Sequence, residues 1–178
     1  MREHYDSADV GRLIDELASI LAARFAPAAP LVIVGIRTRG ETLAVRLTDA
    51  LRERRFVAIG RGVLDITLYR DDLSEIGPKP MVRPTKIDID INAKPLLLVD
   101  DVLFTGRTVR AGLDALADFG RPSAIRLAVL VDRGGRELPI QPDFTALKLG
   151  ELPLDRVVKV RLRERDGRDA IDIEARAV

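Results

Sequence analysis

The sequence has no cysteine, a single histidine, no long hydrophobic run and almost no net charge, and each shortage excludes a class of protein. Without cysteine there is no disulfide, no thiolate metal site and no thiol nucleophile. The one histidine, His4, lies near a terminus that we expect to be frayed, which disfavours imidazole acid–base catalysis. With 29 basic and 28 acidic residues, the net charge of +1 excludes a surface that binds nucleic acid over its whole extent, although a local basic patch remains possible.

No hydrophobic run reaches the length of a membrane span, and residues 1–6 are polar and lead directly into a predicted helix. We therefore expect no signal peptide, and the lack of cysteine favours a cytoplasmic protein. A chain of 178 residues with 47% hydrophobic content suits a single domain, 1–178, with a core at about 31–142.

The most informative stretch of the chain is 96–108. Its apolar beginning, Leu-Leu-Leu-Val at 96–99, predicts a strand buried on both faces of a parallel sheet. Two carboxylates, Asp100 and Asp101, follow where we expect that strand to leave the sheet, and a Thr-Gly-Arg-Thr turn at 105–108 then opens a helix. Ligands bind at the carboxyl edge of such a sheet, and a helix N-terminus offers unpaired N–H groups to phosphate.

This order of groups predicts a site for a ribose 5-phosphate, because two carboxylates that can hold vicinal hydroxyls lie beside a phosphate loop. Taken alone, the acids are as compatible with a solvated turn, and a threonine at a helix start with a simple cap. The whole run favours the ligand site. The phosphate-binding residues we expect are those of one loop: Leu103, Phe104, Thr105, Gly106, Arg107 and Thr108.

The stretch resembles the 5-phosphoribosyl-1-pyrophosphate (PRPP) signature of the type I phosphoribosyltransferases. With LDITLYRDDL at 64–73, LAVLVDRG at 127–134 and RELPI at 136–140, the sequence is specifically similar to the PyrR family. The resemblance covers about 34–140, and the first helix and the C-terminal stretch match much less well. It implies an α/β fold with a central, mostly parallel sheet flanked by helices, a small hood, and a flexible loop at about 70–86.

The residues before this stretch predict a second anion site. We expect a helix over 9–26, a buried strand over 31–36 and, after a Thr-Arg-Gly turn, a second helix that buries Leu43 and Leu47. Arginines in a surface turn are usually only solvated, but a guanidinium also suits bidentate contact with phosphate oxygens. The resemblance identifies the turn as the pyrophosphate loop, formed by Arg37, Thr38, Arg39 and Gly40.

The segment 63–69 is rich in residues that favour strands, and the pattern then breaks among glycines, prolines and charges until about residue 86. Type I phosphoribosyltransferases close such a loop over PRPP, which would bring Arg70 to the pyrophosphate, with Arg83 as a second candidate. The alternative is a mobile linker with no catalytic part. Isoleucines that alternate with acids over 87–91 suggest an exposed strand or hairpin arm of that loop.

The second half of the chain continues the α/β pattern and then changes. A helix ends at Gly120, and a buried strand over 124–131 leads to the same sheet edge as the two acids. Three further strands are expected over 144–149, 156–163 and 170–174, the middle one half-exposed and antiparallel. In the family, this edge builds a hood over the base, which is read largely by backbone groups at Val131, Asp132 and Arg133.

The resemblance implies transfer of the phosphoribosyl group of PRPP to N1 of uracil, giving UMP and pyrophosphate. Such an enzyme needs no protein nucleophile, because it works by electrostatic placement. Mg²⁺ held by PRPP oxygens would neutralise the leaving group, with Asp71 or Asp72 reaching the metal through water. The implied catalytic residues are Asp100, Asp101, Arg39 and Arg70.

PyrR proteins also bind pyr messenger RNA in a UMP-dependent way, through a basic face that spans a dimer, and here the sequence departs from the family. Positions that are basic or hydrogen-bonding in the family carry acidic or neutral residues: Asp15, Glu16, Ser19, Gly135 and Gln141. Because RNA is a polyanion, carboxylates in place of cations weaken binding. RNA binding therefore stays open, with Arg24 and Arg136 as candidate contacts.

Three functions compete. The leading one is a PyrR-like enzyme that makes UMP, with pyr RNA regulation kept or lost. The second is a non-catalytic sensor of PRPP or nucleotide, and the third is a type I transferase acting on a purine or on orotate. Turnover of uracil and PRPP, against a panel of bases, separates them. The resemblance also suggests a homodimer or a higher assembly of dimers.

Overall fold

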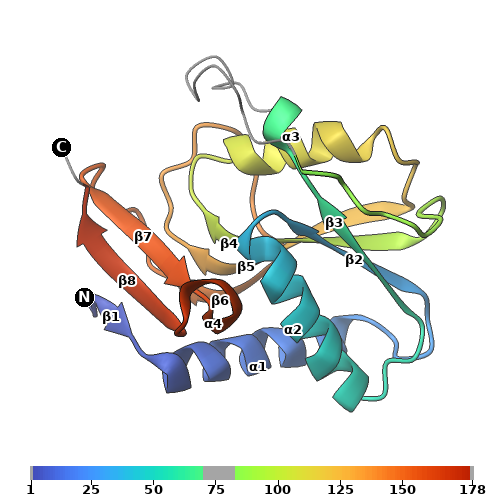
Figure 1. The fold of residues 1–178 in the computed structure, drawn as a ribbon, viewed down its shortest axis with the longest axis horizontal. Helices are drawn as coiled ribbons and strands as arrows, with labels where there is room; N and C mark the ends of the chain where they lie inside the picture. Colours follow the sequence, from blue (N-terminus) through green and yellow to red (C-terminus); the bar gives the residue numbers. More distant parts are fainter. Residues whose placement is uncertain (1, 70–82, 177–178) are drawn as a thin grey trace.

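The computed structural model describes residues 2–69 and 83–176 and contains two sheets (Figure 1). The larger sheet has five parallel strands in the order β3-β2-β4-β5-β6. Its strands are β2 (Leu31–Ile36), β3 (Ile59–Leu64), β4 (Pro95–Leu103), β5 (Ala124–Asp132) and β6 (Phe144–Lys148). The predicted α/β fold with a central parallel sheet is confirmed.

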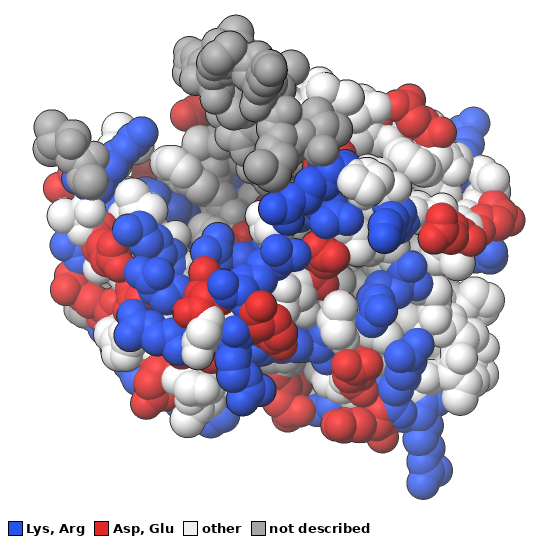
Figure 2. Space-filling view, in the orientation of Figure 1, with Lys and Arg blue, Asp and Glu red and all other residues white. Residues whose placement is uncertain are grey.

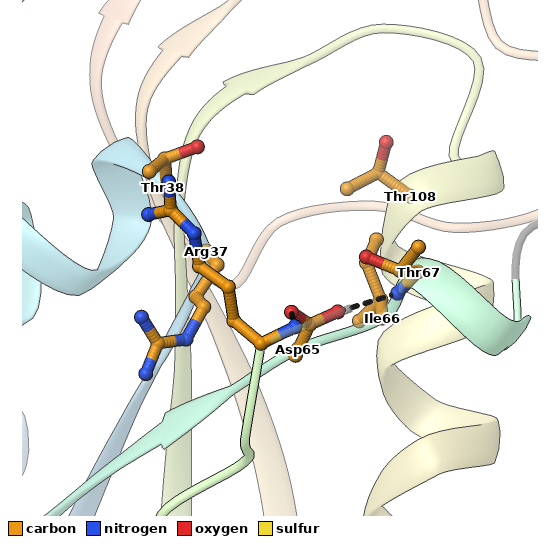
Figure 3. A pocket seen from close by; sticks show the side chains of 7 residues that line it. Arg37, Thr38, Asp65, Ile66, Thr67 and Thr108 are labelled. Atoms are coloured by element: carbon orange, nitrogen blue, oxygen red, sulfur yellow. Dashed lines mark hydrogen bonds between the residues drawn. The ribbon is translucent and has the colours of Figure 1, made fainter. Parts of the chain in front are cut away.

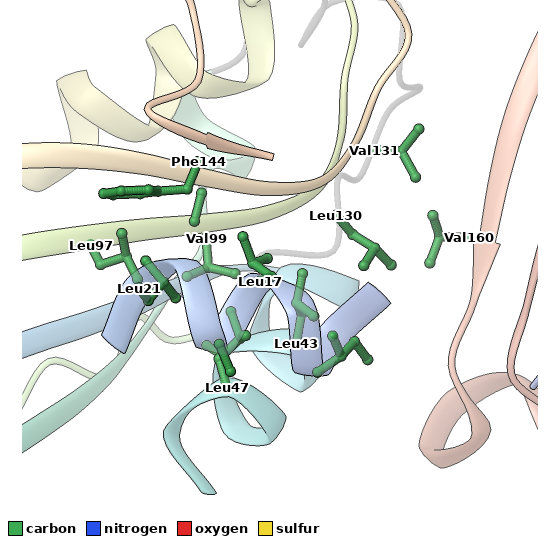
Figure 4. Close-up of a cluster of buried hydrophobic side chains, with 14 of the residues drawn as sticks. Leu17, Leu21, Leu43, Leu47, Leu97, Val99, Leu130, Val131, Phe144 and Val160 are labelled. Carbon is green, nitrogen blue, oxygen red and sulfur yellow. The ribbon is translucent and has the colours of Figure 1, made fainter. Parts of the chain in front are cut away.

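Helices cover both faces of this sheet. Side chains of β4 point alternately to the two faces, so that Leu97 and Val99 pack with α1 (Ser7–Arg24) and α2 (Arg39–Glu53). Figure 4 shows this cluster, with leucines of both helices against the sheet. Leu96 and Leu98 face α3 (Arg107–Leu116) on the other side. Within the described ranges, no helix is long and apolar enough to cross a membrane.

The smaller sheet is antiparallel, in the order β1-β8-β7, and it lies at one end of the molecule (Figure 1). It consists of β1 (His4–Tyr5), β7 (Arg156–Arg161) and β8 (Ala170–Ala175), and the short helix α4 (Arg163–Asp166) connects β7 to β8. We call β7, α4 and β8 the hood. The frayed terminus expected at His4 is wrong, because β1 pairs with β8 and the His4 ring Nδ1 lies 2.7 Å from Asp172 Oδ1.

Two further strand predictions, over 63–69 and 87–91, are also wrong. The strand is β3, which ends at Leu64, and Thr67–Tyr69 forms a 3₁₀ turn, η1. Segment 87–91 forms no strand and is linked to β3 by one isolated bridge at Lys86. Its isoleucines pack into the core instead of forming an exposed arm, and a Cβ on Gly60 would lie 2.6 Å from Ile89 Cδ1. Glycines in β3 therefore leave space for segment 87–91, which packs across the strand. Because glycine is uncommon in strands, β3 lacks the residue pattern by which a strand is predicted.

The strand order of the larger sheet reverses between β2 and β4. The pairing of β2 with β4 ends at Gly35–Val99, whereas β4 continues beside β5 to Leu103–Asp132. Because β3 lies on the far side of β2, the strand order reverses at this point, where ligands bind in open α/β sheets. The two acids lie inside β4, next to this reversal of strand order, and not at the strand end as predicted.

Candidate functional site

A pocket of about 270 Å³ lies at the carboxyl ends of β2 and β3 (Figure 3). Arg37 and Thr38, from the turn after β2, line one side, and Thr108 from the first turn of α3 lines the other. Thr67 and Arg83 complete the polar wall. The structure thus brings the predicted pyrophosphate turn and the predicted phosphate loop to opposite sides of one pocket.

The two acids of β4 are not among the residues that line this pocket; they lie in a low-dielectric position, with Asp100 against Gly40 of the turn after β2. Asp100 is 5% exposed, and its Oδ1 accepts a hydrogen bond of 3.0 Å from the Asp101 N–H. Burial, together with the neighbouring charge of Asp101, raises the pKa of Asp100 well above its ordinary value. Burial also raises the pKa of Asp101, although a hydrogen bond with Asp100 and the charge of Arg39 oppose the rise. Neither acid forms a salt bridge with a described residue, because Arg37 and Arg39 of the nearby turn pair with Glu41 and Asp166, and the two acid side chains hydrogen-bond to each other.

Glycine brings the turn after β2 against these acids. A Cβ on Gly40 would lie 2.5 Å from the Val99 carbonyl oxygen and 3.2 Å from Asp100 Cα. A Cβ on Gly35 would lie 2.4 Å from the Gly40 carbonyl oxygen. Only glycine permits this approach of backbone to backbone, so the place of Gly40 in the site is explained by packing.

The two arginines of the turn point in different directions. Arg37 Nη2 donates to the Pro84 carbonyl at 3.1 Å, and Arg37 Nη1 lies 3.3 Å from Glu41 Oε2, which keeps Arg37 at the pocket. Arg39 instead reaches the hood, where its Nε and Nη2 lie 3.1 and 2.7 Å from the carboxylate oxygens of Asp166. The hydrogen bonds that Arg39 donates to Asp166 raise the pKa of Arg39. Residues that the sequence placed in one pyrophosphate group are therefore separated.

Backbone hydrogen bonds join the predicted phosphate loop to the RELPI run at 136–140. Thr105 O accepts hydrogen bonds from the N–H groups of Glu137 and Leu138 at 3.0 and 3.1 Å, and Arg107 Nε lies 2.7 Å from Glu137 Oε2. Gly106, with φ +94°, makes the left-handed turn that starts α3. This run thus holds the loop whose first helical turn presents backbone N–H groups.

The residues expected at the base lie where the core meets the hood. Arg133 is 4% exposed, its guanidinium lies 3.8 Å from the centroid of the Phe104 ring, and its Nη1 donates to the Arg156 carbonyl at 2.8 Å. Val131 is buried in the sheet, and Asp132 Oδ1 accepts a hydrogen bond from the Gly134 N–H at 3.0 Å. The phosphate loop residue Phe104 and the predicted base residues therefore form one junction.

The two candidate RNA contacts differ in their surroundings. Arg24 is exposed at the end of α1. Arg136 is turned inward, with a side chain 12% exposed, and its guanidinium donates to the carbonyls of Ile140 and Phe104 at 3.0 Å and to Asp132 at 2.7 Å. In this position Arg136 fastens the phosphate loop to the end of β5.

The departures from the family pattern have structural counterparts. Asp15 forms an ion pair with Arg54, whose guanidinium also donates to the Ser19 hydroxyl. Gly135 has φ +71°, and a Cβ there would lie 2.7 Å from Phe104 Cε2, so a larger residue would need a rearranged ring.

Several expectations lie outside the described residues: the roles of Arg70, Asp71 and Asp72, and most of the predicted flexible loop. In the described ranges, no group of three acidic, histidine or cysteine side chains could enclose a metal ion. A divalent cation in this pocket would therefore take most of its oxygen ligands from a bound molecule and water, as Mg²⁺ commonly does.

Sequence reasoning missed two acids. Asp65 is 9% exposed, and its two carboxylate oxygens each accept a hydrogen bond of 2.8 Å, from the N–H groups of Thr67 and Arg83. Burial would raise the pKa of Asp65, but these hydrogen bonds and the charge of Arg37 lower it. Asp166 belongs to a charge-rich run that is typical of a solvated surface, and nothing local indicates that it faces Arg39.

Comparisons with known proteins identify the family and the fold. A family model for the phosphoribosyl transferase domain matches residues 3–159. The bifunctional protein PyrR of Deinococcus radiodurans is 49% identical over 167 residues, 94% of this chain and 91% of that protein. The bifunctional protein PyrR of Chloroflexus aurantiacus is 52% identical over 168 residues, 94% of this chain and 92% of that protein. The crystal structure of the hypoxanthine phosphoribosyltransferase of Trypanosoma cruzi has a TM-score of 0.71 and 17% identity, covering 99% of this chain and 98% of that one, a likeness of fold.

Proposed function

The chain belongs to the PyrR family of phosphoribosyl transferase domain proteins, and we propose that it transfers the 5-phosphoribosyl group of PRPP to uracil, giving UMP and pyrophosphate. One observation carries the proposal. The N-terminus of α3 faces an arginine-bearing turn across the pocket, and the carboxyl pair Asp100 and Asp101 follows on β4, with Asp100 packed against Gly40 of that turn. This is the arrangement that a sugar with a phosphate, a diol and a pyrophosphate requires.

The residues match the charges that develop in the reaction. The bond between C1 of the ribose and the pyrophosphate oxygen breaks, pyrophosphate leaves with the electron pair, and N1 of uracil forms the new bond and loses its proton. Asp100 and Asp101 hold the ribose hydroxyls and stabilise the positive ring by their charge. Arg37 and Thr38 bind the leaving pyrophosphate. Thr105, Thr108 and the first N–H groups of α3 hold the 5-phosphate throughout.

A divalent cation fits this site through its ligand. The pocket offers threonine hydroxyls and one carboxylate but no protein cage among the described residues, so we propose that Mg²⁺ enters bound to PRPP. When bound, the ion supplies neutralisation of the leaving pyrophosphate charge. The chain's own part is to orient PRPP, with Asp71 and Asp72 retained as candidates for outer-sphere contact.

We propose that the base lies at the junction of Phe104 with residues 131–133, next to C1 of a ribose held by the acids. Backbone groups there would read the base, which leaves its identity to experiment. The assay follows UMP formation with radiolabelled uracil, PRPP and Mg²⁺, with hypoxanthine and orotate as competing bases.

The decisive variant is the double substitution Asp100→Asn with Asp101→Asn. We expect it to fold and to lose most turnover, whereas Asp49→Asn, which changes an exposed acid of α2, keeps the wild-type rate. Near-normal pyrophosphate release by the double variant would refute the assignment. A wild-type chain that binds PRPP but never turns it over would favour the sensor instead.

A second function is regulation. Relatives that are about half identical carry the name bifunctional protein PyrR, and we propose UMP-dependent binding of pyr leader RNA, with Arg24 among the contacts. We place the protein in the cytoplasm, as a homodimer or a higher assembly of dimers. A gel shift with the leader RNA, with and without UMP, tests the RNA binding. No shift in either condition would leave the protein with its enzyme activity alone.

A further inference from the structure

Basic and acidic side chains alternate over the surface around α2 and the hood (Figure 2). One of these contacts reaches the site. We infer that Asp166 is a positioning residue that holds the guanidinium of Arg39 away from Asp101, so that the Asp101 carboxylate stays open to a ligand hydroxyl. The inference rests on the proposed function only for the identity of that ligand, the ribose of PRPP.

Asp166 is a fixed anchor. Its Oδ2 accepts a hydrogen bond of 2.8 Å from the Leu162 N–H as well as the one from Arg39 Nε. The helix that carries it is held to α2 by two further contacts, in which Arg46 pairs with Glu164 at 2.6 Å and Arg165 pairs with Glu41 at 2.8 Å. Arg39 is therefore held toward the hood, because Asp166 is itself fixed and cannot move with Arg39 toward Asp101.

Asp101 competes with Asp166 for the same guanidinium. The two groups interact electrostatically, since each favours the charged form of the other, yet Arg39 forms its salt bridge with Asp166 and none with Asp101 among the described residues. The charged groups around them are Asp100 on β4, beside Asp101, and Arg161 on β7, beside Arg39.

Without Asp166, the half-buried Asp101 is the remaining described acid whose charge acts on Arg39. A guanidinium closed on Asp101 would occupy the oxygens that we assign to the ribose, and a substrate hydroxyl would have to displace an ion pair formed away from bulk water. The Asp166 contact thus keeps Asp101 free of an ion pair with Arg39. In return, the positive charge of Arg39 is held away from Asp101.

The test is Asp166→Asn in the full chain. The amide oxygen can still accept from Leu162 N–H and Arg39 Nε, but the amide nitrogen now faces Arg39 Nη2, donor against donor. We expect the KM for PRPP to rise about tenfold, the size of one hydrogen bond to a charged group, with kcat changed less than about twofold. An unchanged KM overturns the inference.

The matched control is Glu164→Gln, which weakens another ion pair of the same helix, where Asp169 still holds Arg46 at 2.7 Å. We expect its kinetics to equal those of the wild type. If Glu164→Gln raises the KM for PRPP as much as Asp166→Asn does, the cause is loosening of the helix, and the inference is wrong.

A second measurement needs no turnover. Carbon-13 NMR titration of the ligand-free chain, with the Asp101 signal assigned by Asp101→Asn, reports the charge around this carboxyl. In Asp166→Asn we expect the midpoint of Asp101 to fall by about one pH unit, because one negative charge is lost and Arg39 moves closer. An unchanged or higher midpoint overturns the inference, while a chain with no uracil activity would refute the proposed function and leave this result standing.

Discussion

Asp100→Asn should make the protein more stable at neutral pH while it weakens the enzyme. Asp100 is 5% exposed and lies next to a second carboxyl, so its charged form loses hydration and faces a like charge. A neutral amide of the same shape removes both penalties. Its oxygen can keep the hydrogen bond from the Asp101 N–H, and its nitrogen can donate to the Asp101 carboxylate, so no new polar group is left without a partner.

The size of the gain follows from the cost of an uncompensated buried polar group, about 1–3 kcal/mol. For a chain of this length, each kcal/mol raises the melting temperature by roughly 2–4 °C. On the functional side, the variant loses one charged hydrogen bond to a ribose hydroxyl, which corresponds to a fall in kcat/KM of about 10- to 100-fold.

The pH dependence has a definite sign. The folded-state pKa of Asp100 is raised above the unfolded value near 3.8, so the folded state binds the proton more tightly. The penalty is therefore present at neutral pH and is relieved as the pH falls through the folded-state pKa. Other acids, whose pKa values are lowered, change in the opposite direction but are common to both proteins.

The assay is urea unfolding of wild type and variant at pH 7 and pH 5, with UMP formation measured on the same samples. We expect the stability advantage of the variant to be larger at pH 7 than at pH 5. A variant that is no more stable at pH 7, with the pH dependence of the wild type, would refute the claim that burial penalises this carboxylate.

Three further substitutions test other parts of the site. Gly40→Ala places a methyl group 2.5 Å from the Val99 carbonyl oxygen, so we expect a loss of about 1–3 kcal/mol and of PRPP turnover, while Gly11→Ala, with nothing within 4 Å, costs no stability in thermal unfolding. Asp65→Asn should lower the free energy of unfolding at pH 7 by about 1–2 kcal/mol. Because the Asp65 pKa is lowered, that difference should shrink as the pH falls through its folded-state pKa, and a constant difference would contradict this. Arg136→Gln removes donors to three carbonyls and a carboxylate and should cost about 2–3 kcal/mol in urea unfolding; wild-type stability would show that this inward arginine fastens nothing.

Prediction from the sequence succeeded where the pattern is local. The strands expected over 31–36 and 124–131 consist mostly of apolar residues, and the helix after the predicted phosphate loop combines apolar spacing with a glycine turn, so neighbouring residues decide these elements. It failed where a distant segment decides. β3 is rich in glycine because Ile87 and Ile89 cross it, and His4 is ordered by pairing with β8, which follows at the other end of the chain.

The candidate site divides in the same way. The candidate groups could be located from the sequence, since a carboxylate pair, a glycine turn before a helix and an arginine turn each have a local pattern, and their roles stay predictions. Their hydrogen-bond partners could not be predicted, because these lie far along the chain. Arg136 donates to the Phe104 carbonyl, 32 residues away, and Asp65 accepts from the Arg83 N–H, 18 residues away.

The arginine turn shows why this matters for function. Arg37 and Arg39 are two residues apart and carry the same charge, so composition and spacing assign them one role. In the fold, Arg37 is held at the pocket by Pro84 and Glu41, whereas Arg39 is held by Asp166 at the opposite side, near Asp101. The difference arises from a carboxylate 127 residues away. The position of each charged side chain is therefore fixed by the partner that binds it. By binding Arg39, Asp166 of the hood keeps that guanidinium away from Asp101, the acid that we assign to the substrate.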